Sequence, residues 1–417
     1  MTSYQKLLGG IGESFSDRNF RIHSIGAIAS WISFFIQIVA VSWVAWELTQ
    51  STKWLAIISL LDIIPNILLL PFGGALADRF DRYKIMMCLN PLLLIQAVVI
   101  TLLAYFGLLT IWWLSLLVLI HGVLLSFSVP AMYGMLPRFV DKSVLSSAIA
   151  VNSAYAQFAI FAGPAIAGWI ISAYSAAIAF AVNAVGYAIL IISMSFLKTP
   201  IGYQQSPAST SSITSDIVDG VKYIFEQKGI AALLVIALAG EALAAGIYHM
   251  APAYADEFLN MGVTGVSLLL SSIGVGATIS AIWLARGGTD VLSMDRVLWA
   301  FFLFSISIAM LFLTKNLYLI IVFCVVVGIT VELYSTGTLS MIQLAIEDSQ
   351  RGRVMGNLWG MKQIAAGIGT YIIGAYAVSK GLAPPMLIAV GLCLVVWLLI
   401  YRSRSRLKLT IKRDTLH

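Results

Sequence analysis

Twelve long apolar runs, separated by short charged loops, constrain the fold of this chain more than any other feature. A helix needs about 20 apolar residues to cross the hydrocarbon core of a bilayer. The runs lie near residues 22–46, 54–77, 85–106, 110–136, 144–172 and 176–197, and then near 229–250, 263–285, 296–314, 317–344, 353–379 and 383–401. We therefore predict an all-α membrane protein with twelve transmembrane helices.

The composition argues against a soluble fold, and the motifs argue against an enzyme. Of the 417 residues, 60% are hydrophobic and 11% are charged, whereas about a quarter of the residues in a soluble domain are charged. The sequence contains neither a nucleotide-binding phosphate loop nor a Gly-x-Ser-x-Gly hydrolase motif. Its three cysteines lie far apart, which does not suggest a metal motif. We therefore predict no enzymatic activity, no cofactor and no metal site.

The lysine and arginine residues are distributed unevenly between the two sides of the predicted helices. One side holds only Lys53, Lys315 and Lys380, and nearly all the others fall in the termini and loops of the opposite side. Because positively charged loops stay in the cytoplasm, we predict that both termini are cytoplasmic, in a bacterial inner membrane. The net charge of +6 then reflects topology and contact with the lipid bilayer, and no nucleic-acid partner is expected.

A polar stretch divides the chain into two halves. We predict an N-terminal six-helix half over residues 1–197, a cytoplasmic linker over 198–228, a C-terminal six-helix half over 229–401 and a basic cytoplasmic tail over 402–417. Apolar residues from Ile217 to Phe225 recur at helical spacing, so the linker is expected to contain a short amphipathic helix. Its role is expected to be structural, and a regulatory role remains the alternative.

The two halves also resemble each other in sequence. Gly163 and Gly168 in the fifth predicted helix correspond to Gly369 and Gly374 in the eleventh, at an offset of 206 residues. The same offset pairs Gln157 with Gln363. An offset of about half the chain length indicates two fused six-helix repeats.

The loop between the second and third predicted helices carries a specific motif. Residues 73–84 read GGALADRFDRYK, with a glycine pair, an Asp-Arg pair and a basic cluster. This loop resembles the signature of the major facilitator superfamily, and the resemblance extends over essentially the whole chain. It implies two pseudo-symmetric six-helix bundles that transport a solute by alternating access. It also implies a gating motif, which would consist of Gly73, Gly74, Asp78, Arg79, Asp81, Arg82 and Lys84.

The residue types of this motif suit a moving contact. Glycine allows a helix to approach its neighbour closely, and Asp78 can face the positive N-terminal end of another helix. The alternative is that the loop only fixes the topology.

The fifth predicted helix carries a motif that indicates one branch of this superfamily. Residues 156–168 read AQFAIFAGPAIAG, which is similar to the motif of family members that export by antiport, and this stretch includes Gln157, Gly163, Pro164 and Gly168. The chain thereby resembles the drug-efflux and siderophore-export branch. It departs from proton antiporters in the fourth helix, where His121 is the polar residue instead of an arginine.

Ionisable side chains inside a bilayer are costly, about 2.5–3.5 kcal/mol each, and mark functional sites. Glu241, Glu332 and Lys362 lie at similar depth in the second half, and Asp62 and His121 lie in the first half. We predict that these five residues carry proton coupling or substrate binding. The alternative for the charged residues of the second half is a static ion pair. Further residues expected to line the cavity are Gln37, Asn66 and Tyr334, together with the aromatic Trp31 and Phe34.

The sequence therefore predicts a secondary transporter, most simply a monomeric, proton-coupled exporter of an amphipathic small molecule such as a drug or a siderophore. Two alternatives remain open. An importer of a small metabolite or siderophore would use the same fold, and a transport-inactive receptor or scaffold would need no coupling residues.

Overall fold

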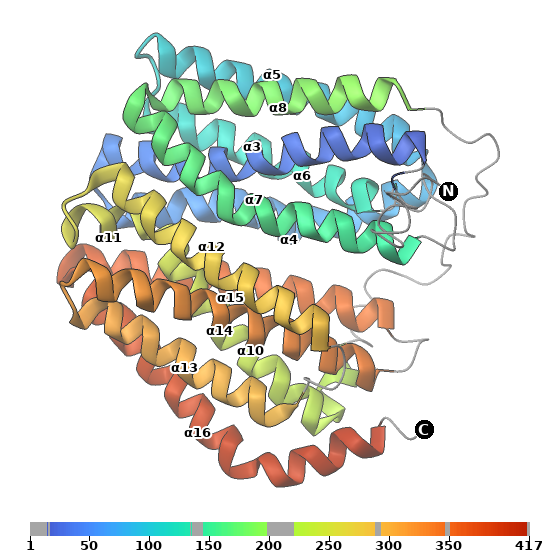
Figure 1. Cartoon of the computed structure of the whole chain (residues 1–417), viewed down its shortest axis with the longest axis vertical. Coiled ribbons are helices and arrows are strands. Elements are labelled where there is room, and N and C mark those ends of the chain that lie inside the picture. Colours follow the sequence, from blue (N-terminus) through green and yellow to red (C-terminus); the bar gives the residue numbers. More distant parts are fainter. Residues whose placement is uncertain are drawn as a thin grey trace, which may run out of the picture. The chain divides into compact units, whose positions relative to one another are not determined.

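The computed structural model describes residues 15, 17–133, 135, 145–197, 221–287, 293–346 and 351–414, and the elements of this part are all helical (Figure 1). In chain order the helices are α3 (Arg18–Thr49), α4 (Thr52–Arg79), α5 (Arg82–Tyr105), α6 (Ile111–Tyr133), α7 (Leu145–Ala173), α8 (Ala176–Ser195), α10 (Lys228–His249), α11 (Ala251–Glu257), α12 (Gly262–Gly287), α13 (Met294–Leu313), α14 (Leu317–Ala345), α15 (Arg351–Lys380) and α16 (Ala383–Asp414).

Each predicted apolar run coincides with one long helix. Among the described residues, ten helices are long and apolar enough to cross a membrane. The helix α7 contributes a shorter apolar stretch, Phe158–Ala173, and α15 falls outside this set because it carries Asn357, Lys362, Gln363 and several glycines. The predicted total of twelve transmembrane helices therefore stays a prediction.

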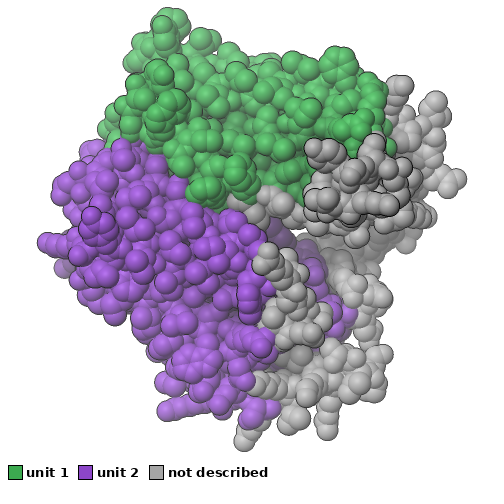
Figure 2. Space-filling model, viewed as in Figure 1, with its two compact units in different colours: residues 1–48, 64–209 green, residues 49–63, 210–417 purple. Residues whose placement is uncertain are grey.

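The chain divides into two compact units (Figure 2). Unit 1 comprises residues 1–48 and 64–209, and unit 2 comprises residues 49–63 and 210–417. The helix α4 contributes its first part to unit 2 and its second part to unit 1. The predicted domain boundaries remain predictions, and residues 198–220 of the predicted linker lie outside the described residues. Residues 221–226 are helical, and Ile224 is buried there.

Unit 1 is organised around the paired helices α5 and α8, which run side by side (Figure 1). Leu93 and Ala97 of α5 pack with Ala184 and Tyr187 of α8 in one buried apolar cluster. Small residues at such contacts let two helix backbones approach closely, which is how helices associate where lipid removes the hydrophobic driving force.

Unit 2 contains a closer approach of two helices. A Cβ atom on Gly276 of α12 would overlap the backbone carbonyl oxygen of Val325 in α14, and a Cβ on Gly328 of α14 would overlap that of Ile273 in α12. The two glycines therefore face each other's helix in a reciprocal contact. Any larger side chain at either position would have to push the backbones apart.

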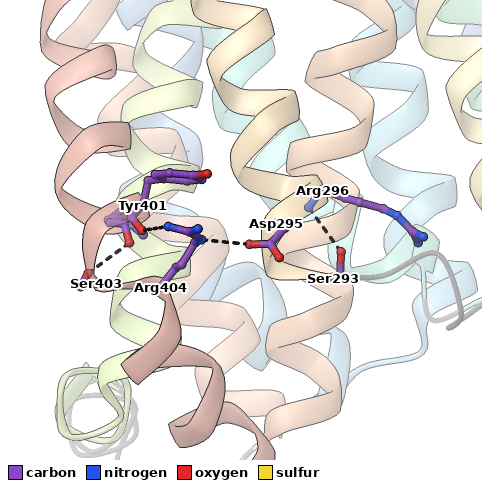
Figure 3. A network of polar contacts seen from close by, with 7 residues as sticks. Ser293, Asp295, Arg296, Tyr401, Ser403 and Arg404 are labelled. Atoms are coloured by element: carbon purple, nitrogen blue, oxygen red, sulfur yellow. Dashed lines mark hydrogen bonds and ion pairs between the residues drawn. The ribbon is translucent and has the colours of Figure 1, made fainter.

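The helix α16 continues well beyond the predicted end at residue 401, as far as Asp414. Three contacts hold its first extra turn (Figure 3). Arg404 Nε lies 3.5 Å from Asp295 Oδ1 on α13, the Arg404 guanidinium lies 3.7 Å from the centre of the Tyr401 ring, and Arg404 Nη1 donates to the Tyr401 carbonyl at 2.9 Å. The hydropathy of the sequence predicts only the apolar part of this helix, because most residues of the extension are polar or basic.

Candidate functional site

The charged site predicted for the second half contains an ion pair in unit 2. Lys362 Nζ on α15 lies 3.0 Å from Glu241 Oε2 on α10 and donates a hydrogen bond to Ser335 Oγ on α14 at 3.1 Å. The exposed fraction of the side chain is 22% for Lys362 and 28% for Glu241. Three helices thus meet at one ammonium group, which is neutralised by the carboxylate yet remains reachable.

Glu332 has a different partner. Its Oε1 accepts a hydrogen bond from Thr336 Oγ1, one turn further along α14, at 2.6 Å. Among the described residues no ion pair joins Glu332 to Lys362. The sequence predicts a group of two acids and one lysine. In the structure Glu241 and Lys362 form an ion pair, and Glu332 lies on α14, three residues before Ser335.

Tyr334 lies between these polar residues along α14, but its side chain is completely buried. It packs against Phe301 and Phe304 of α13, with ring centroids 5.6 Å and 5.0 Å away, and it fills the space that Gly240 of α10 leaves open. Its hydroxyl has no hydrogen-bond partner within the described structure. Tyr334 therefore joins α14 to its neighbours by packing.

The predicted residues of the first half are distributed over several helices. Asp62 lies half-buried on the part of α4 that belongs to unit 2, whereas Asn66, one turn later, belongs to unit 1 and accepts a hydrogen bond from Ser126 Oγ at 3.4 Å. His121 is buried on α6, with Nε2 3.4 Å from the Tyr187 hydroxyl. The oxygen of the buried Gln37 amide has no hydrogen-bond partner among the described residues.

The signature loop has a defined local structure. A Cβ on Gly73 would overlap the Ser126 carbonyl oxygen on α6, whereas Gly74 has open space around it. Asp81 caps the N-terminus of α5 by accepting a hydrogen bond from Tyr83 N at 2.8 Å. Arg82 Nε donates to the Ala77 carbonyl at 3.2 Å, closing the loop on itself. The remaining basic residues of the motif, Arg79 and Lys84, are exposed.

Asp78 is part of α4, but its side chain lies outside the described part of the structure. The same holds for the side chain of Gln157 in α7. The roles predicted for both residues therefore remain expectations from the sequence.

The motif of the fifth predicted helix forms a close helix contact. A Cβ on Gly163 of α7 would overlap Phe35 of α3, and Pro164 and Gly168 are buried beside it. The repeat-related Gly369 of α15 makes the corresponding contact, against the backbone of Ala242 in α10. Gln363 lies half-buried on α15. In each unit, the helix with this glycine motif therefore packs tightly against that unit's first long helix.

Two of the residues at the charged site were not predicted from the sequence. Ser335 binds Lys362 and Thr336 binds Glu332, yet hydroxyl residues are common in transmembrane helices, where they bond to their own backbone. The only signal was their position, three and four residues after Glu332 in a mostly apolar run.

Known proteins resemble this chain in sequence. Residues 13–414 match a family described as transmembrane secretion effector. Macrolide efflux protein A of Streptococcus pyogenes is 22% identical, over 88% of this chain and 91% of that protein. The staphyloferrin A transporter of Staphylococcus aureus is 21% identical, over 76% of this chain and 79% of that protein.

Solved structures resemble it in fold. A bacterial homologue of the human lysosomal transporter Spinster, inward-facing and occupied, matches with a TM-score of 0.74 at 13% identity, over 95% of this chain and 97% of that one. The nucleoside transporter NupG matches with a TM-score of 0.67 at 14% identity, over 92% of this chain and 98% of that one. At such low identity these matches show the fold alone.

Proposed function

Because the chain belongs to the transmembrane secretion effector family of the major facilitator transporters, we propose that it is a proton-coupled exporter of amphipathic small molecules. As a member of this family it is a multi-pass membrane transporter and not an enzyme. The coupling ion, the direction of transport, the substrate class and the alternating-access cycle are the proposed parts.

The observation that carries the coupling is the ion pair between Glu241 and Lys362. A paired ammonium and carboxylate are together neutral, which lowers the cost of placing either charge inside the membrane. A cationic or hydrogen-bond-donating group of the solute would compete with Lys362 for the Glu241 carboxylate, while Lys362 keeps its hydrogen bond to Ser335. Protonation of Glu241 would remove that carboxylate, so binding of a proton and binding of the solute would oppose each other, as proton-driven export requires.

Glu332 provides a second protonatable group. The bond from Thr336 reaches Oε1, which leaves the second carboxyl oxygen, Oε2, as the atom that would carry a proton. We assign it the role of an alternative or intermediate proton carrier.

Export as the direction is supported by the relatives whose printed names describe efflux and by the glycine-proline motif of α7. Import is the competing direction, and a transport-inactive receptor is the competing class. We further propose that the protein acts as a monomer in a bacterial inner membrane, with both termini in the cytoplasm.

Coupling is tested with purified protein in proteoliposomes that contain a pH-sensitive dye. An outward gradient of a macrolide or of staphyloferrin A should drive proton movement in the parent protein. Glu241→Gln should abolish this proton movement while solute binding persists, whereas Glu257→Gln on the short helix α11, where the side chain is exposed, should behave like the parent. Proton movement that survives in Glu241→Gln, in Glu332→Gln and in the double variant would refute the proposed coupling. Solute flux without any proton movement would support a different driving ion.

A further inference from the structure

A cavity of about 140 Å³ lies within unit 1. Its walls come from α3, α5, α6 and α8, with one residue from α7 and with Met135, which follows the end of α6. A cavity of about 150 Å³ accommodates a benzene molecule. The cavity of unit 1 therefore has room for one ring or for a short aliphatic segment.

The walls carry no formal charge. In the described structure the lining contains no aspartate, glutamate, lysine or arginine, and its titratable side chains are His23 and Tyr187. Burying an unpaired ion against such a wall would cost far more than burying a neutral group. The cavity therefore favours an uncharged occupant.

Methionine is unusually frequent in the lining, which includes Met86, Met132, Met135 and Met194. A methionine side chain is unbranched and polarisable, so it adapts to ligands of different shape and makes favourable contacts with aromatic rings. Trp31 and Phe34 add two aromatic faces. These residues favour a ring or a branched aliphatic group without specifying one shape.

Two hydrogen-bond donors in this wall have weak partners. Asn90 Nδ2 donates to the sulfur of Met194 at 3.5 Å, and Ser128 Oγ donates to the sulfur of Met86 at 3.4 Å. Both donors are buried. Because a thioether sulfur is a weak acceptor, a carbonyl or ether oxygen of a ligand would be a better partner for either donor.

Two lining residues contact His121. The side chains of Tyr187 and Phe34 both line the cavity, and both contact His121 behind it, through the 3.4 Å contact of the Tyr187 hydroxyl and through ring stacking on Phe34 at 6.1 Å. A wall held from behind can present the same surface to successive ligands. This arrangement gives His121 a positioning role.

We propose that this cavity binds an uncharged, oxygen-bearing apolar group of the transported solute, with its carbonyl or ether oxygen accepting hydrogen bonds from Asn90 or Ser128. The solute would then be amphipathic, with its neutral end held in unit 1. This inference deepens the proposed transport function and rests on it for the identification of the ligand as the solute.

The test uses the purified full-length protein in lipid nanodiscs and three fluorinated probes of similar size. The ketone para-fluoroacetophenone carries an acceptor oxygen, para-fluoroethylbenzene lacks it, and para-fluorobenzoate is charged. Fluorine NMR line widths give the dissociation constants, with empty nanodiscs as the correction for partition into lipid. We expect the ketone to bind about two- to tenfold more tightly than the hydrocarbon, the range set by one net hydrogen bond, and the benzoate to bind most weakly.

Two variants connect this binding to the cavity. Ser30→Phe places a ring in the cavity and should weaken the binding of both neutral probes at least tenfold. Ile25→Phe, at an exposed position on the same helix, is the control and should bind them like the parent. The double variant Asn90→Leu with Ser128→Ala keeps the volume nearly constant and removes both donors. It should bind the ketone and the hydrocarbon equally while retaining affinity for the hydrocarbon.

Three results would overturn the proposal. Equal binding of ketone and hydrocarbon by the parent would mean that the cavity accepts any apolar group, including a lipid chain. Unchanged affinity in Ser30→Phe, or preserved discrimination in the double variant, would place the probes elsewhere. These are equilibrium measurements without a gradient, so intact ketone binding in a protein that moves no protons would overturn the proposed coupling alone.

Discussion

The preference of the protein for anionic or cationic solutes should depend on Lys362, whose ammonium group contacts Glu241 and Ser335. Lys362→Met leaves the Glu241 carboxylate without its cation. We expect this variant to lose binding of anionic solutes and to keep or strengthen binding of cationic ones, which would pair with the released carboxylate. Isothermal titration with one solute of each charge measures this, with Lys380→Met, an exposed position on the same helix, as the control. Equal losses for both charges would make Lys362 a purely structural partner.

The same variant should also reduce stability. Removing one partner of a fully buried ion pair costs about 3–5 kcal/mol, and the partial exposure of Glu241 and Lys362 should reduce this cost. We expect Lys362→Met to unfold at a lower temperature in detergent than the parent, and Lys362→Met combined with Glu241→Gln to recover most of the loss. A double variant as unstable as the single one would mean that packing, rather than the unpaired charge, is responsible.

Asp81 and Asp78 stand three residues apart in the signature loop and should respond differently to substitution. Asp81 caps α5, and loss of a cap costs about 0.5–2 kcal/mol. Asp81→Ala should therefore lower the melting temperature, while Asp81→Asn, which can still accept the hydrogen bond, should not.

Asp78→Asn should instead slow transport in proteoliposomes at unchanged stability, as expected for a gating residue. Parent-like turnover in Asp78→Asn would refute that role.

At the residue scale, the sequence predicts charges better than their partners. Glu241, Glu332 and Lys362 stand out because each interrupts an apolar run. Which of them pair depends on how α10, α14 and α15 are rotated about their axes, and the hydropathy of these helices contains no information on rotation. The partners Ser335 and Thr336 and the donors Asn90 and Ser128 were therefore found only in the structure.

At the scale of helices, the reciprocal contact of Gly276 and Gly328 should be sensitive to a single methyl group. Gly276→Ala and Gly328→Ala each place a Cβ against a backbone carbonyl of the other helix, and overpacking of this kind costs about 1–3 kcal/mol. Gly391→Ala on α16 is the matched control, because a Cβ there meets nothing within 4 Å and alanine favours a helix. We expect both contact variants to lower the melting temperature and the control to maintain or raise it. Parent-like melting of both contact variants would show that α12 and α14 can separate freely.

Helix positions were the part of the fold that hydropathy predicted well, since every predicted run lies on one helix. Hydropathy did not predict two elements. The helix α11 has only seven residues, too few for a periodic signal, and its Tyr254 is held by packing against Phe258 and Phe312. The extension of α16 depends on the contact of Arg404 with a different helix, α13.

For the whole molecule, the uneven distribution of lysine and arginine predicts a topology that chemical labelling can test. In a background without the three native cysteines, Lys380→Cys should react with a membrane-impermeant maleimide in intact cells. Lys222→Cys, on the exposed face of the helical segment before α10, should react only after the cells are permeabilised. The reverse pattern would place both termini outside the cytoplasm.

The division of α4 between the two units has a consequence for biosynthesis. Thr52 donates a hydrogen bond to the Gly374 carbonyl, 322 residues further along the chain, and a Cβ on Gly374 would press on Ala56. At about 5–20 residues per second, the ribosome needs roughly 16–65 s to make that stretch of chain. The first turns of α4 are thus inserted long before their partner helix α15 exists. The nascent protein must hold this helix surface in lipid, or against the insertion machinery, until almost the last helix has been synthesised.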